Sequence, residues 1–291
     1  MLKCFEDGDH FELQDKLAFK LKHQFQGHPT LSLDNLCRFI PSLPKAHVHY
    51  SKGLLQTGDD FDSAPVDHPN GLSITQTIEN MRTVDSYIMV RQPEVDPSFA
   101  DFQRDLVNDL QVLVQRRGWG NRIVNPKLYL FVSSPNSVTP FHIDRFSNFL
   151  MQVSGSKTVT VFPPWDERVV APHEAERRMA DEKGPAWKPG SQTLGTPFQL
   201  EAGDALHIPF VAGHHVKNGP QDVSVSLSVF FNHRETAHRV RALLFNHAMR
   251  PGMAKVGLAP RPVGKSAMHD QLKSHTYRAA SWMLRGLNKA D

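Results

Sequence analysis

The spacing of hydrophobic and polar positions changes near residue 127. Before it, apolar residues recur at helical spacing and predict a long helix from about Ser98 to Arg117 and a shorter one that Ser32 caps and Pro41 ends. Leu17 to Phe25 alternate with polar residues, which predicts a half-buried strand. After it, five short β-rich runs are separated by turn residues: KLYLFVSS, NFLMQVSG, KTVTVFPP, ALHIPF and DVSVSLSVFF.

Regularly spaced short strands of this kind are typical of an antiparallel sandwich or barrel. We therefore predict a mainly β fold with helical additions: a main domain over residues 1–233, with the β core at about 120–233 and further strands and helices in 1–119. A polar insertion at 166–197, with a short helix at 173–183, is expected at the barrel rim. Residues 234–291 form a separate helical segment, interrupted by a Pro- and Gly-rich link at 251–264.

Composition places the chain among ordinary globular proteins, with 291 residues, 40% of them hydrophobic and 22% charged. No apolar run approaches a membrane span, and the first residues carry acids where a secretory signal needs a basic end and an apolar core. Cys4 and Cys37 are too few for a disulfide framework and lack the paired spacing of a zinc site. We expect a soluble cytoplasmic protein with no membrane partner, whose metal ligands, if any, are His and carboxylate.

Charge is unevenly distributed along the chain. Residues 234–291 hold eleven Lys and Arg against three acids, a net charge of +8, which leaves the first 233 residues at −5. A basic tail can bind nucleic acid, but a solvated helical face is the commoner explanation, so we do not expect a nucleic-acid partner. Its apolar residues instead predict a homodimer through the C-terminal helices; they are Val240, Leu243, Leu244, Tyr277, Trp282, Met283 and Leu284.

Two potential metal ligands lie two residues apart beside a predicted strand. His142 and Asp144 project to the same face of an extended segment, so they can hold one ion together. In a closed barrel a distant strand can add a second imidazole, and His214 and His215 are adjacent candidates. Two imidazoles and one carboxylate with open positions form the facial triad of non-haem Fe(II) oxygenases. With 16 His residues in the chain, the pattern alone is a weak signal.

The surrounding motifs make the signal specific. The stretches HIDRFSNFLMQVSGSKTVTVFPP and GDALHIPFVAGHHVKNG resemble the core of JmjC-domain and related cupin-like hydroxylases, most of all the asparaginyl hydroxylases. The resemblance covers roughly residues 80–92 and 127–232. It implies a double-stranded β-helix (jelly-roll) core with flanking helices, Fe(II), 2-oxoglutarate as cosubstrate and O2. In this family the ligand is the His directly before the aliphatic residue, which selects His215 over His214.

The resemblance also assigns roles outside the triad. Lys157 would bind the distal carboxylate of 2-oxoglutarate, with Thr139 donating a hydrogen bond and Tyr87 reaching the same carboxylate. Asn148 would contact the cosubstrate near the iron. Ser228 stands where the asparaginyl hydroxylases have an Asn, so their substrate is not carried over.

The function predicted is a dioxygenase that couples decarboxylation of 2-oxoglutarate to succinate with C–H hydroxylation of a protein side chain or an amino-acid-like small molecule. Two alternatives stay open: a metal cupin with isomerase or lyase chemistry, in which Lys157 has no cosubstrate to bind, and a catalytically silent interaction module. His214 and His207 are expected outside the metal site, as neighbouring or surface residues.

Overall fold

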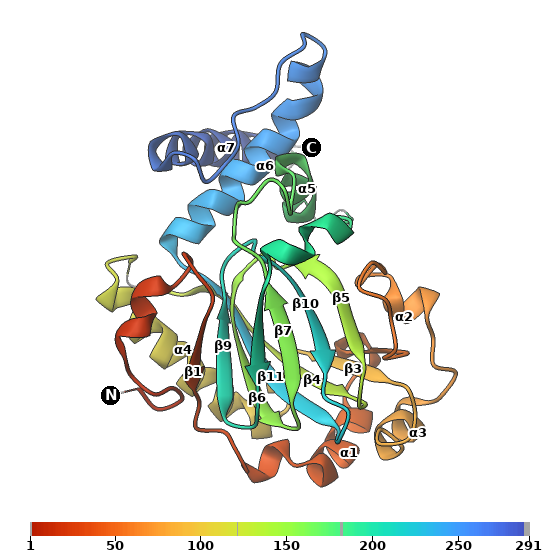
Figure 1. Cartoon of the computed structure of the whole chain (residues 1–291). Helices are drawn as coiled ribbons and strands as arrows, with labels where there is room; N and C mark the ends of the chain where they lie inside the picture. Colours follow the sequence, from red (N-terminus) through yellow and green to blue (C-terminus); the bar gives the residue numbers. More distant parts are fainter. Residues whose placement is uncertain (1, 121, 181–182, 288–291) are drawn as a thin grey trace.

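Two antiparallel β-sheets face one another and form the centre of the fold (Figure 1). The computed structural model describes residues 2–120, 122–180 and 183–287. The seven-stranded sheet has the order β1-β9-β6-β11-β4-β3-β2, with β1 Phe19–Lys22, β9 Asp204–Ile208, β6 Ser147–Ser154, β11 Ser224–Asn232, β4 Val124–Ser133, β3 Tyr87–Arg91 and β2 Val48–Ser51. The four-stranded sheet has the order β5-β10-β7-β8, with β5 Val138–Ile143, β10 Gly213–Asn218, β7 Lys157–Val161 and β8 Thr196–Leu200. The predicted jelly-roll core with flanking helices is confirmed.

The five apolar runs all form strands, whereas β5 and β8 carry too little apolar pattern to be predicted as strands. Each contains a proline, Pro140 or Pro197, and each lies at an edge of the four-stranded sheet. Proline donates no ladder hydrogen bond, so an edge strand is where it is tolerated. The two prolines therefore weaken the sequence signal without preventing the strands.

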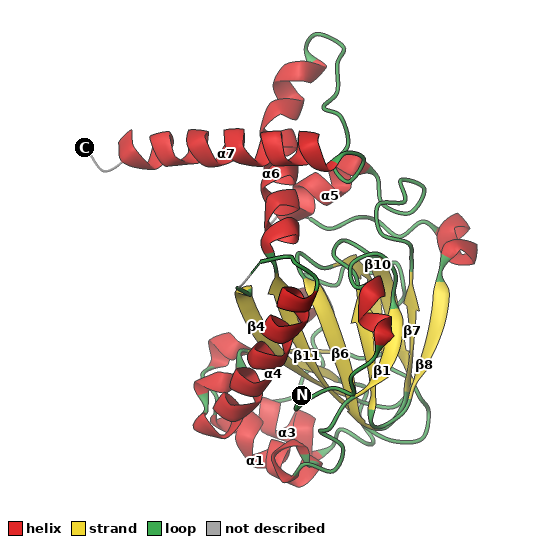
Figure 2. Cartoon of the chain, turned by 90° about the vertical axis from the view of Figure 1, so that its left-hand side faces the viewer, coloured by secondary structure: helices red, strands yellow, loops and turns green. Residues whose placement is uncertain are grey.

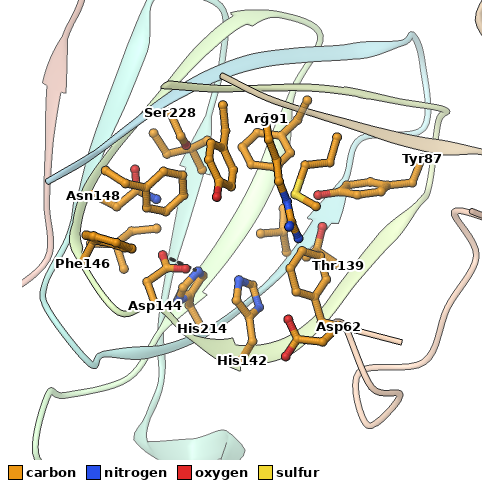
Figure 3. Close-up of a pocket in the computed structure, with 18 of the residues that line it drawn as sticks. Asp62, Tyr87, Arg91, Thr139, His142, Asp144, Phe146, Asn148, His214 and Ser228 are labelled. Carbon is orange, nitrogen blue, oxygen red and sulfur yellow. Dashed lines mark ion pairs between the residues drawn. The ribbon is translucent and has the colours of Figure 1, made fainter. Parts of the chain in front are cut away.

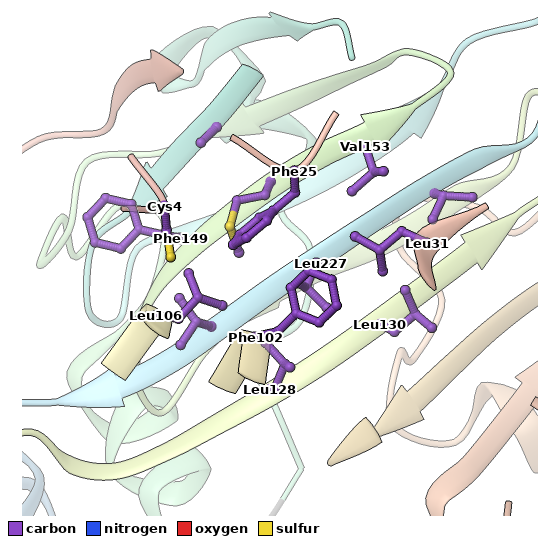
Figure 4. Close-up of a cluster of buried hydrophobic side chains, with 14 of the residues drawn as sticks. Cys4, Phe25, Leu31, Phe102, Leu106, Leu128, Leu130, Phe149, Val153 and Leu227 are labelled. Atoms are coloured by element: carbon purple, nitrogen blue, oxygen red, sulfur yellow. The ribbon is translucent and has the colours of Figure 1, made fainter. Parts of the chain in front are cut away.

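Side chains of β4 alternate between two environments. Leu128 and Leu130 lie in the main hydrophobic core on the outer face of the large sheet, while Tyr129 and Phe131 line a cavity between the two sheets. The outer core also contains Phe102 of helix α4 and Phe149 of β6 (Figure 4). The period of two along a strand thus separates the residues that stabilise the fold from those that shape the cavity.

The outer core is covered by helices from the first half of the chain (Figure 2). Helix α4, Pro97–Arg116, lies where its apolar spacing predicts it, and Ser32 caps α1, Leu33–Ser42, by accepting a hydrogen bond from the Asn35 amide. Pro41 lies inside α1 rather than ending it. The shorter helices of this half of the chain are α2 Ala64–Asp67, which lies near β5 instead (Figure 1), and α3 Ile74–Glu79; 3-10 turns lie at Asp9–Leu13, Pro29–Leu31, Lys45–His47 and Pro93–Val95.

Helices α5, α6 and α7 gather beyond one end of the sheets (Figure 1). Helix α5, Pro172–Met179, comes from the predicted insertion, which also contains a 3-10 turn at Pro189–Leu194. Helix α6, Arg234–Ala254, runs past Pro251, and α7, Ala267–Leu287, packs across it (Figure 2). The division into segments 1–233 and 234–291 stays a prediction. None of the helices in the described ranges is long and apolar enough to cross a membrane.

A buried carboxylate joins the N-terminal segment to the barrel and to α6. Asp15 accepts hydrogen bonds from Ser147 Oγ at 2.7 Å, the Phe210 amide at 3.0 Å and His233 Nε2 at 2.7 Å. Its own amide donates to His207 Nε2 at 2.9 Å. Burial raises the pKa of this carboxyl, but the bond from His233 and the two nearby imidazoles outweigh it and hold the pKa below its usual range. Asp15 therefore stays ionised inside the protein.

Candidate metal site and cosubstrate pocket

Three side chains converge at one end of the cavity between the sheets (Figure 3). His142 lies on β5, Asp144 directly follows that strand, and His214 lies on β10 opposite His142 in the antiparallel register. One potential ligand atom from each side chain lies within 4.8 Å of the others. Neighbouring strands thus bring together residues that are about seventy positions apart.

The structure does not bring the predicted third ligand, His215, to this cluster; it places His214 with the other two residues instead. Successive side chains on a strand point to opposite faces, so only one of the two adjacent imidazoles can enter the cavity. His215 points away from it, with Nε2 3.3 Å from Gln192 Oε1 and its ring 5.6 Å from that of Trp187. Val216 lines the cavity on the same face as His214. The alternation of side chains along a strand puts His214 on the same face as the apolar Val216, and this pattern could have selected His214. The match to the family motif selected His215 instead.

Both inward imidazoles are oriented by backbone carbonyls. His142 Nδ1 lies 2.8 Å from the Pro140 carbonyl oxygen and His214 Nδ1 lies 3.1 Å from that of Ala212. A carbonyl only accepts, so each Nδ1 donates and each Nε2 is left as a lone-pair donor to a metal. Phe61 stacks on the His142 ring at 4.5 Å. Burial is the largest cause that holds the pKa of His142 well below its usual value, which favours the neutral, metal-binding form.

The carboxylate of Asp144 fits a cation at this position. Its Oδ2 is buried and has no hydrogen-bond partner among the described residues, and His214 Nε2 lies 3.7 Å away. Burial raises the pKa of Asp144, while His214, Arg178 and a hydrogen bond from Asn148 lower it in part. An unpartnered carboxylate oxygen beside two imidazoles is the donor set of a divalent transition metal.

Lys157 is buried in the same cavity, whose volume is about 210 Å³. Its Nζ donates to Ser226 Oγ at 2.7 Å, and in the described part of the chain no carboxylate forms an ion pair with it. Burial lowers the pKa of Lys157 to about 7. A cation removed from water without an anionic partner is costly, so the surroundings of Lys157 suit a bound anion.

The remaining predicted site residues also line this cavity: Thr139, Asn148 and Tyr87. Thr139 is a hydrogen-bond partner of the Tyr87 phenol, whose pKa burial raises. Asn148 Oδ1 and Ser228 Oγ are buried without a hydrogen-bond partner in the described ranges. The lining therefore offers several uncommitted polar groups to a small polar ligand.

Several residues at the cavity were not found from the sequence. Arg178 of α5 pairs with Asp62, with Nη2 3.1 Å from Oδ1, and its Nε donates to the Ile143 carbonyl at 3.3 Å. The insertion thus contributes a wall of the cavity, as expected for an insertion at the barrel rim. Arg91 and Tyr129 also line the cavity, on the large sheet. Only the alternation of β3 and β4 could have indicated the last two, and nothing local indicates the Asp62–Arg178 pair.

Sequence comparison gives the family directly. Residues 54–237 match the family described as the cupin-like domain, and the chain belongs to this family. Among curated proteins, the mouse tRNA wybutosine-synthesizing protein 5 is 29% identical over 105 residues, which cover 35% of this chain. The match spans 33% of that protein's length.

Solved structures share the fold. An Escherichia coli YcfD structure aligns with a TM-score of 0.53 and 17% identity over 94% of this chain and 68% of that chain. Another, described as the ribosomal oxygenase YcfD in complex with cobalt and 2-oxoglutarate, aligns with a TM-score of 0.45 and 17% identity over 89% of this chain and 59% of that chain. The first of these supports the cupin-like architecture derived above.

Proposed function

We propose that this protein is an Fe(II)- and 2-oxoglutarate-dependent oxygenase. One observation carries the proposal: an open-sided His–Asp–His cluster and a buried lysine without an acidic partner among the described residues line the same cavity. The cluster suits a metal with free coordination positions, and the lysine suits the far carboxylate of a chelating keto acid. Either feature alone would be compatible with several chemistries, whereas the pair favours this one.

Each residue has a role in this proposal. His142 and His214 would bind Fe(II) through Nε2, and Asp144 through its unpartnered oxygen. With 2-oxoglutarate and O2 bound, iron supplies the oxidising power that breaks an unactivated C–H bond. Lys157 would bind the distal carboxylate of 2-oxoglutarate as a charge-assisted hydrogen-bond donor.

The hydroxyls of Tyr87 and Thr139 would bind the same carboxylate, and Asn148 would hold both the cosubstrate and the Asp144 carboxylate. These side chains line the cavity inside the barrel, where fixed polar groups act more strongly than in water. The protein's contribution is therefore to orient the cosubstrate and to exclude bulk water from it.

The buried lysine also separates this function from the isomerase or lyase chemistry of other metal cupins. Such enzymes need no second anion site some distance from the metal, so nothing in their chemistry would offset the desolvation cost of Lys157. A silent interaction module would likewise have no need for uncommitted polar groups in a cavity. Both alternatives leave the same residues unexplained.

We further propose hydroxylation of a protein side chain or an amino-acid-like molecule. A cavity of about 210 Å³ has room for a group of side-chain size beside the cosubstrate. The free cysteines Cys4 and Cys37 agree with the cytoplasmic location predicted from the sequence.

An anaerobic titration tests the proposal. Adding Fe(II) and then 2-oxoglutarate should produce the weak visible charge-transfer band of the chelate, and admission of O2 should release succinate. His214→Ala should remove the band and His215→Ala should retain it. Absence of the band in the wild-type protein, with Fe(II) shown to be bound, would refute the assignment of 2-oxoglutarate.

Dimerisation through α7 is a separate proposal. Four large apolar side chains of this helix are exposed: Met268, Leu272, Trp282 and Met283, at 73%, 66%, 74% and 60%. This much apolar surface on one projecting helix is unusual for a monomer. A second copy of the chain would cover it; the side chain of Leu284, also predicted to contribute, lies outside the described ones.

A further inference from the structure

Strand β3 directs three side chains into the cavity. Tyr87, Met89 and Arg91 occupy alternate positions and all line it. Figure 3 shows the Arg91 side chain extending from the strand toward the cavity interior, in the direction of Thr139 and His142. Tyr87 has a role in the proposed cosubstrate site, whereas Arg91 has none.

The guanidinium of Arg91 is not committed to an ion pair within the described ranges. The two carboxylates nearest the metal end of the cavity are engaged elsewhere: Asp62 pairs with Arg178, and Asp144 belongs to the candidate metal site. The Arg91 backbone is held in place, because its carbonyl accepts a hydrogen bond from His47 Nδ1 at 2.8 Å. Arg91 is thus a charged side chain on a fixed strand, facing a pocket without a counter-ion from the described residues.

The strand register places the backbone of Arg91 away from the Lys157 end of the cavity. Arg91 lies opposite Tyr129, and Tyr129 lies opposite Ser228, whereas the Ser226 that bonds Lys157 is two residues further along β11. On β3 itself, Arg91 is four residues from Tyr87, about 13 Å along the strand at about 3.3 Å per residue. Arg91 therefore begins nearer the metal end than the Lys157 end of the cavity.

An aromatic surface adjoins this position. The Tyr129 ring lies 4.8 Å from that of Phe230 and 6.3 Å from that of Phe131, and Phe146 lies 6.4 Å from Phe230. All four rings line the cavity. A planar or apolar group can pack against them while an anionic group reaches the guanidinium.

We propose that Arg91 binds a carboxylate of the substrate that is to be oxidised, whose apolar body packs against Tyr129 and Phe230. The inference rests on the proposed function and adds the substrate class: a small carboxylic acid with a planar or apolar body, held beside the metal. A guanidinium recognises a carboxylate with two parallel hydrogen bonds, which fixes orientation as well as position. Substrates that present only an amide or a cation here would leave Arg91 unpaired.

Benzoate is a suitable probe because it has this shape and no further functional group. The protein is loaded with Mn(II) and N-oxalylglycine, an unreactive mimic of 2-oxoglutarate, and benzoate binding is measured by ligand-observed NMR and calorimetry. Arg91→Gln should weaken benzoate at least about tenfold, the loss expected for one charge-assisted contact. Arg91→Lys should restore part of the affinity. Arg82→Gln is the matched control, since it removes an exposed cation paired with Asp222 outside the cavity.

Three results would overturn the inference: no benzoate binding to the wild-type protein, equal affinity in Arg91→Gln, or competition between benzoate and N-oxalylglycine, which would assign Arg91 to the cosubstrate. Benzyl alcohol, which lacks the carboxylate, should bind wild type and Arg91→Gln equally weakly. Failure of the proposed function has a different signature, because N-oxalylglycine would then not bind to the Mn(II)-loaded protein. The benzoate measurement is repeated without metal, so it tests the role of Arg91 whether or not the protein binds N-oxalylglycine.

Discussion

Lys157→Met should stabilise the protein while removing its cosubstrate. The folded pKa of about 7 lies below the ordinary value of 10.5, so the folded state disfavours the charged amine. At about 1.4 kcal/mol for each pH unit between these values, the lysine costs about 4 kcal/mol at pH 7. Methionine keeps the volume without the charge but leaves Ser226 Oγ buried and unbonded, which costs about 2 kcal/mol. The net expectation is a gain of about 2 kcal/mol in the free energy of unfolding.

The pH dependence of this gain has a definite sign. Between pH 7 and 10.5 the unfolded lysine binds a proton that the folded one does not, so the stability of the wild type rises with pH across this window. The variant lacks this rise. Its advantage should therefore shrink by up to about 1.4 kcal/mol per pH unit above pH 7.

Urea unfolding at pH 7, 8 and 9, followed by circular dichroism, measures the gain, and calorimetric titration of the Mn(II) protein with 2-oxoglutarate measures the loss of affinity. That loss should be at least about tenfold, because the variant lacks a charge-assisted hydrogen bond. Mn(II) affinity should stay unchanged, since Lys157 is not in the metal cluster. An advantage that is absent at pH 7, or that does not shrink toward pH 9, would refute the buried-cation argument; unchanged 2-oxoglutarate affinity would refute the role of Lys157.

Three further predictions use other parts of the molecule. His214→Ala should weaken Mn(II) or Fe(II) binding by at least about 100-fold and His215→Ala by less than about threefold, measured by calorimetry. The reverse order would show that His215 is the ligand, as the sequence predicted. Asp15→Asn should lower the free energy of unfolding by about 3 kcal/mol at pH 7. Because the folded pKa of Asp15 is lowered, this difference from wild type should persist above about pH 4 and disappear in stronger acid. A difference that does not depend on pH would contradict this. Deleting 266–291 should halve the mass seen by light scattering; a monomeric full-length chain would refute dimerisation through α7.

Much of the jelly-roll could be predicted because its strands carry their own signal. The five apolar runs became β4, β6, β7, β9 and β11. Edge strands β5 and β8 depend on neighbours for their hydrogen bonds and contain proline, so their local sequence says little. These two strands are therefore recognised only from their pairing with β10 and β7 in the folded structure.

The candidate site also contains residues that the sequence could predict and residues that it could not. His142, Asp144 and Lys157 were recognisable because motif and spacing place them, and all three line one cavity. The choice between His214 and His215 depended on strand parity, which a one-residue shift inverts. The Asp62–Arg178 pair joins segments 116 residues apart, and no local pattern reports such a contact.

The folding unit is larger than the segment that sequence similarity delimits. The family match begins at residue 54, yet β1 pairs along β9, and Asp15 accepts hydrogen bonds from Ser147 and Phe210. Excision of residues 54–237 would bare the β9 edge and expose Phe149, which packs on Phe5 and Phe19. Such an open edge beside apolar rings is a template for association with other chains. A trimmed protein of this kind would aggregate, so the N-terminal segment should be kept whenever the cupin-like domain is moved into another protein.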